Sequence, residues 1–127
     1  MVLLDSSIWI DHLRDPDALL SALLQRAEIL IHPLVLGEIA MGNMKARASR
    51  MEFLSSLPLA DIAENADVLE LVHQQHLYGT GLGFVDAHLL ASAGLTPQTL
   101  LWTRDKRLLN AARKLGVAFE EPGRRVQ

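Results

Sequence analysis

Two carboxylates of this chain lie inside apolar segments with the spacing of helices. Glu38 is the only charged residue among residues 34–41, and Asp86 is the only acidic residue among residues 84–91. An ionised carboxylate on an apolar helix face is costly unless it is paired, hydrogen-bonded or bound to a cation. No Lys or Arg lies at helical spacing from either acid. Helical spacing instead places apolar side chains beside them: Leu34 and Met41 near Glu38, and Leu82, Leu89 and Leu90 near Asp86.

Two further carboxylates follow apolar runs that are typical of buried parallel strands. Asp5 directly follows residues 2–4, and Asp105 comes two residues after residues 100–103. Because ligands collect at the carboxyl ends of the strands in α/β sheets, we expect these acids to face one crevice. Four converging acids would suit Mg²⁺ or Mn²⁺, which prefer carboxylate and water oxygens. Two such ions about 3.5–4 Å apart can activate water and neutralise a phosphodiester, so a metal-dependent phosphodiesterase is the hypothesis from the residues alone.

Each of the four acids also has an explanation that needs no metal. Asp5 and Asp105 could cap the helices that follow them, which is the commoner role of Asp after a strand. Glu38 could accept a hydrogen bond from a serine at position 6 or 7, or pair with a distant Arg. The charge of Asp86 would complement the dipole of its helix. Spacing alone leaves these explanations open.

Strands and helices alternate along the chain. The expected strands are residues 2–4, 28–32, 99–103 and 117–119. The expected helices are residues 8–14 (capped by Ser6 and Ser7), 19–24, 34–41, 46–57, 63–78 (the longest), 84–93 and 105–115. Because each strand must return by a crossover to the same side, the strands should be parallel. The predicted fold class is α/β: a three-layer α/β/α sandwich with a small parallel sheet of about four or five strands, formed by residues 1–127 as a single domain.

Composition excludes several classes of protein. Of the 127 residues, 50% are hydrophobic and 21% are charged, which is typical of a folded domain with a core. The chain has no cysteine, so disulfides, zinc–thiolate sites, iron–sulfur clusters and thiol nucleophiles are excluded. No apolar run approaches the roughly 18 residues of a membrane span, and we expect a cytoplasmic protein. Because the net charge is -3, a nucleic-acid partner would need a local basic patch or metal ions.

Four segments together resemble the PIN-domain family, and within it the VapC-like toxins of bacterial toxin–antitoxin pairs. They are residues 4–10 (LDSSIWI), 36–42 (LGEIAMG), 83–91 (GFVDAHLLA) and 101–105 (LWTRD). The resemblance implies an α/β/α PIN fold and an endoribonuclease that depends on Mg²⁺ or Mn²⁺. Asp5, Glu38, Asp86 and Asp105 match the family's acidic quartet, and Ser6 and Thr103 match the hydroxyl residues that support it. The sequence after the third acid, with His88, departs from the more aliphatic pattern of many relatives.

The same resemblance implies partners: a homodimer, an RNA substrate and a small VapB-like antitoxin whose C-terminal segment lies over the active site. Basic residues flank the last acid, and Arg104, Lys106 and Arg107 are candidates for RNA phosphate contacts. A non-catalytic module that binds RNA or protein through the same crevice is the alternative. A phosphatase with Asp5 as its nucleophile ranks last, because Ser7 stands where such enzymes typically carry a second Asp.

Overall fold

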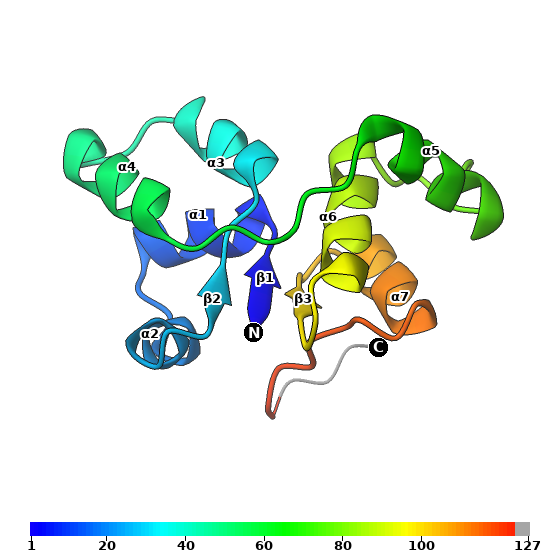
Figure 1. The fold of residues 1–127 in the computed structure, drawn as a ribbon. Helices are drawn as coiled ribbons and strands as arrows, with labels where there is room; N and C mark the ends of the chain where they lie inside the picture. The colour runs from blue at the N-terminus through cyan, green and yellow to red at the C-terminus, as the bar shows by residue number, and fades with distance from the viewer. Residues whose placement is uncertain (124–127) are drawn as a thin grey trace.

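The computed structural model describes residues 1–123, and its centre is a small parallel sheet (Figure 1). The three strands are β1 (Val2–Leu4), β2 (Ile29–Leu30) and β3 (Leu100–Trp102), in the order β2-β1-β3. Val2 pairs with Ile29 on one side and with Leu100 on the other, and both pairings are parallel. The prediction of a small parallel sheet is therefore confirmed.

The sheet has fewer strands than the sequence predicts. Within residues 1–123 it has three strands, and single parallel bridges lie beyond them, between Ile31 and Leu59 and between Leu101 and Ala118. The expected strand at residues 117–119 is thus reduced to the bridge at Ala118. The reason is its length, since the chain is in a turn by Pro122 and Gly123, so no further pairing follows.

Seven helices in the described part of the chain surround the sheet. They are α1 (Ser6–Arg14), α2 (Ala18–Gln25), α3 (Pro33–Ala40), α4 (Arg47–Ser56), α5 (Asn65–Gln74), α6 (Phe84–Leu95) and α7 (Lys106–Lys114). The chain steps from β1 to β2 in one direction and from β2 to β3 in the other. Because parallel crossovers are right-handed, the crossover with α1 and α2 and the crossover with α3 to α6 should cover opposite faces of the sheet. Helix α3 of the second crossover also packs against α1 of the first. Figure 1 shows this layered α/β arrangement, with α1 behind the sheet and α6 in front, which confirms the predicted fold class.

The core explains why the strand segments are continuous apolar runs. Leu3 and Leu4 in the central strand have no exposed surface, as expected for a strand covered on both faces. Trp9 on α1 and Trp102 on β3 are also completely buried. None of the helices within residues 1–123 is long and apolar enough to cross a membrane.

Most helix bounds differ from the predictions by a residue or two, and the largest differences at a helix C-terminus are in α5 and α6. The expected helix 63–78 ends at Gln74, because His76 adopts a left-handed conformation (φ 53°) and the Leu77 N–H bonds back to the Val72 carbonyl. The longest helix is instead α6, with 12 residues, which continues through Gly94. It ends before Pro97, since a residue preceding proline is disfavoured in helical conformation.

Candidate active site

Asp5 is held rigidly at the carboxyl end of β1. Its side chain is buried, with 6% of its surface exposed. Oδ1 accepts hydrogen bonds from the Ile8 backbone N–H (3.1 Å) and from the Ser7 hydroxyl (2.7 Å). Asp5 is therefore the N-cap of α1, and the expectation that Ser6 and Ser7 cap this helix is wrong. The carboxylate is the better cap because the chain is still extended at Asp5 and turns into the helix at Ser6.

Thr103 connects Asp5 to Asp105. The Thr103 hydroxyl donates to Asp5 Oδ2 and accepts a hydrogen bond from the Asp105 backbone N–H (3.0 Å). Asp105 in turn caps α7, because its Oδ1 accepts from the Leu108 N–H (3.0 Å). One buried hydroxyl thus joins the carboxyl ends of the adjacent strands β1 and β3. From the carboxyl ends of β1 and β3 the chain continues in different directions. An α/β sheet opens a crevice at such a point.

Asp86 lies close enough to Asp5 and Asp105 for their charges to affect its pKa. It is half-buried in the first turn of α6, and its Oδ2 accepts from the Gly83 N–H (3.1 Å). Burial raises the pKa of Asp86, and the negative charges of Asp105 and Asp5 raise it further, although the Gly83 N–H opposes them. As predicted, it shares a helix face with buried leucines, since Leu89 and Leu90 are each 1% exposed.

Glu38 has a different environment from the predicted one. It is exposed, as are its helical neighbours Leu34 (38%) and Met41 (89%). The interpretation that Glu38 lies on a buried apolar face is therefore wrong. The face of α3 that packs into the core carries Val35 and Ile39 instead, four residues apart. Because an exposed carboxylate costs little free energy, Glu38, unlike a buried acid, needs no cation to offset the cost of burial.

The donor chemistry of the four acids fits a hard divalent cation. None of them forms an ion pair with a basic side chain among residues 1–123. In the same part of the chain no hydrogen bond engages Asp86 Oδ1 or Asp105 Oδ2, so each keeps an oxygen for a ligand. The described residues nevertheless contain no group of three side chains already at metal-binding distances. Asp86 interacts electrostatically with Asp5 and Asp105, and Glu38 lies on another helix, α3.

The predicted supporting and basic residues differ in how they are held. Ser6 is half-buried at the start of α1, and the hydroxyl that bonds to Asp5 is that of Ser7, which sequence reasoning missed. The guanidinium of Arg104 is engaged by three carboxylates, those of Asp11 (3.5 Å), Asp17 (3.0 Å) and Glu121 (2.7 Å), and it also lies over the Trp102 ring.

Lys106 and Arg107 are exposed in the first turn of α7, directly after Asp105. The Arg107 side chain lies across the backbone of Gly81. A Cβ atom built on Gly81 would be 2.6 Å from an Arg107 guanidinium nitrogen, and φ at this glycine is 88°. Glycine at position 81 therefore lets Arg107 reach the loop that leads to Asp86.

Two buried histidines next to the acids were also missed. His32 ends the β2 segment, caps α3 and is 1% exposed, while His88 lies two residues after Asp86 and is 4% exposed. The signal in the sequence was their position, since each follows or interrupts an apolar run on an element that carries an acid.

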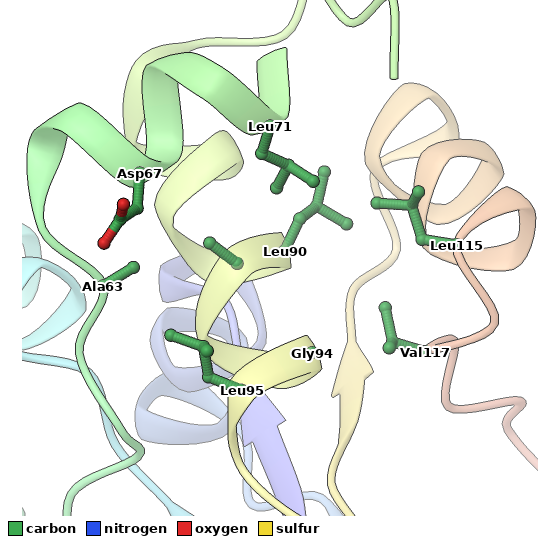
Figure 2. A pocket seen from close by; sticks show the side chains of 9 residues that line it. Ala63, Asp67, Leu71, Leu90, Gly94, Leu95, Leu115 and Val117 are labelled. Carbon is green, nitrogen blue, oxygen red and sulfur yellow. The ribbon is translucent and has the colours of Figure 1, made fainter. Parts of the chain in front are cut away.

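An apolar pocket of about 360 Å³ lies elsewhere, between α5, α6 and the segment after α7 (Figure 2). Its walls include Leu71, Leu90, Leu115 and Val117, and Asp67 is the only acid in its lining. This pocket lacks converging polar side chains like those at the carboxyl ends of the strands.

Comparison with known families matches residues 2–114 to the PIN domain. Two relatives named Ribonuclease VapC32, from Mycobacterium tuberculosis strains CDC 1551 / Oshkosh and ATCC 25618 / H37Rv, are each 46% identical to this chain over 121 residues. The alignment covers 95% of this chain and 98% of each relative. No solved structure matches the chain significantly.

Proposed function

The chain belongs to the PIN-domain family, and from this premise we propose that it is a metal-dependent endoribonuclease and the toxin of a toxin–antitoxin pair. The single observation that supports the activity is the cluster at the strand ends, in which Thr103 joins Asp5 to Asp105 and Asp86 lies within their field. The two relatives are named as VapC ribonucleases and match almost the whole chain.

In this proposal Asp5, Asp86, Asp105 and Glu38 hold Mg²⁺ or Mn²⁺. When bound, such an ion lowers the pKa of a coordinated water and neutralises charge on a phosphodiester. Ser7, Ile8 and Thr103 fix the Asp5 carboxylate before any ligand arrives, so little ordering entropy remains to be lost. Nearby positive charge would also relieve the repulsion that raises the pKa of Asp86.

RNA phosphates would be held by Lys106 and Arg107, which are exposed beside Asp105. Arg104 was predicted for the same role, but its three carboxylate partners make it the least available of the three. We further propose that residues 1–127 form one domain, that the protein acts in the cytoplasm as a homodimer, and that a VapB-like antitoxin inhibits it. The acidic cluster would attract a basic segment of such a partner.

The test is cleavage of total cellular RNA by the purified, antitoxin-free protein with Mg²⁺, Mn²⁺ or EDTA. Discrete products with either metal and none with EDTA would support the nuclease. Glu38→Gln should abolish cleavage while leaving the fold intact, because Glu38 is exposed. Glu52→Gln is the matched control, since Glu52 is an exposed glutamate on α4, and it should cleave like the unmodified protein.

The outcomes separate the nuclease from the alternative. Binding of RNA without cleavage in any metal would favour the non-catalytic binding module. Full activity of both Glu38→Gln and Asp86→Asn would refute the assignment of these acids as metal ligands.

A further inference from the structure

Two buried imidazole rings lie between the helices that carry Glu38 and Asp86. His32 is the N-cap of α3, and His88 lies on α6, two residues after Asp86 and on a different face of the helix. Their ring centroids are 5.9 Å apart and the rings meet edge to face, at 64°. The Phe84 ring packs against the other side of His88, with centroids 4.8 Å apart. The pair is therefore enclosed.

The hydrogen bond at one nitrogen fixes the tautomer of His32. Its Nδ1 accepts from the backbone N–H of Leu34 at 3.0 Å. Because a backbone amide can only donate, Nδ1 carries no proton, and the neutral ring must carry its proton on Nε2. Burial, and secondarily the neighbouring His88, lower the pKa of His32 to about 4, so the ring is neutral near pH 7.

The complementary tautomer follows for His88. Its Nε2 lies 2.8 Å from Asn65 Oδ1, which can only accept, so Nε2 carries the proton and Nδ1 presents a lone pair. Both His32 Nε2 and His88 Nδ1 are buried, and neither has a hydrogen-bond partner within residues 1–123. One is a donor and the other an acceptor, on rings in contact. A buried polar atom without a partner costs about 1–3 kcal/mol in general, which favours an arrangement that satisfies both.

We propose that His32 and His88 are a positioning pair for the metal site, in which one water links His32 Nε2–H to His88 Nδ1. The resulting chain runs from the Leu34 amide through both rings to Asn65. It joins α3 to α6 and α5, and so sets the position of Glu38 relative to Asp86.

The packing of the helices explains why such a link is needed. Helix α3 packs mainly against α1 and α4, whereas α6 packs against α5, β3 and α7. Figure 1 shows α3 and α6 on opposite sides of the strand ends. Helix α3 packs against α1, which begins beside Asp5, but it has no comparable packing against α6, and Glu38 is exposed without an ion pair in the described chain. The consequence for metal binding rests on the proposed function, whereas the hydrogen bond does not.

His32→Asn and His88→Gln each remove the ring with the nitrogen that faces its partner, but keep a polar group for the other hydrogen bond. His32→Asn keeps an oxygen that caps α3, because asparagine is a good N-cap residue. His88→Gln keeps a polar group that can reach Asn65. The matched control is His73→Gln, since His73 is exposed on α5.

The first measurement is Mn²⁺ binding by calorimetry, which needs no turnover. We expect each single variant to weaken Mn²⁺ binding by about tenfold, as for the loss of other groups that orient metal ligands. The double variant should be no weaker than either single variant, because both remove the same link. His73→Gln should bind like the unmodified protein. Additive losses in the double variant, or unchanged binding in both singles, would overturn the proposal.

The second measurement is nitrogen-15 NMR of the histidine side chains in the metal-free protein. The expected result is the Nε2–H tautomer for both rings and a slowly exchanging His32 Nε2 proton that becomes fast-exchanging in His88→Gln. A proton on His88 Nδ1 would overturn the pair. If the protein cleaves no RNA but shows this signature, the proposed function fails while the hydrogen-bonded pair stands.

Discussion

Replacing Thr103 by valine tests whether one hydroxyl holds the two strand-end acids together. Valine has nearly the shape of threonine, so the packing of this buried side chain (3% exposed) should change little. The hydroxyl that donates to Asp5 and accepts from the Asp105 N–H is lost. A stability change can then be assigned to hydrogen bonding.

The structure sets the expected size of the effect. A hydrogen bond to a charged group contributes about 1.5–3 kcal/mol, and a bond between neutral groups about 0.5–1.5 kcal/mol. Since Thr103 makes one of each, we expect the free energy of unfolding to fall by about 2–4.5 kcal/mol. Thr99→Val is the matched control. Thr99 is also buried (5%), but its hydroxyl donates only to the Pro97 carbonyl at 3.2 Å, so a loss of about 1 kcal/mol or less is expected.

The assay is urea denaturation of the metal-free protein, followed by the fluorescence of the two buried tryptophans. In an Asp5→Asn background the cost of Thr103→Val should shrink by about 1 kcal/mol, because a neutral acceptor forms a weaker bond. A loss in Thr103→Val no greater than that in Thr99→Val would refute the reasoning. So would a cost that is the same in both backgrounds at position 5.

Three further predictions follow from other contacts. The pKa of His32 is lowered to about 4, so below pH 6.5 the unfolded chain takes up a proton more readily than the folded protein does. The free energy of unfolding should therefore fall by up to about 3 kcal/mol between pH 6.5 and 4. In urea titrations, His32→Asn should remove this part of the pH dependence. Arg104→Gln should cost about 1–2 kcal/mol of stability by loss of its ion-pair network. Arg107→Gln should change stability by less than about 0.5 kcal/mol and weaken RNA binding. Equal stabilities of the two variants would contradict a structural role for Arg104 and an RNA-binding role for Arg107. Asp86→Asn should abolish RNA cleavage but leave the thermal midpoint of the metal-free protein unchanged or higher, because burial and the charges of Asp105 and Asp5 disfavour the ionised side chain; a clearly lower midpoint would contradict it.

Much of the fold followed from local pattern. The apolar runs at residues 2–4 and 100–103 predicted buried parallel strands, and both lie in the sheet. The extent of pairing at the edges of the sheet was less predictable, because an edge strand pairs with only one neighbour. Whether residues 117–119 pair over several residues or at Ala118 alone depends on where the following turn begins.

The helix ends show the same division. The sequence predicted that α6 ends at residue 93, whereas the helix continues through Gly94 to Leu95, just before the residue that precedes Pro97. The end of α5 at Gln74 depends instead on His76, which is left-handed because the buried Leu77 returns to the core. No local pattern in residues 63–78 indicates that return.

For the candidate site, the sequence by itself determined which residue types stand after the strands and in the first turn of α6. That was enough to select Asp5 and Asp105, because the carboxyl end of a parallel strand is a fixed place in an α/β sheet. Glu38 and Asp86 were selected because each is the lone acid of an apolar helical segment. The tertiary structure alone decided what each acid contacts: that the Thr103 hydroxyl joins two strands, that Ser7 rather than Ser6 holds Asp5, and that Glu38 is exposed. It also decided that His32 and His88 meet. Such contacts join residues distant in the chain, and their geometry depends on how whole helices pack, which the spacing within one segment does not encode.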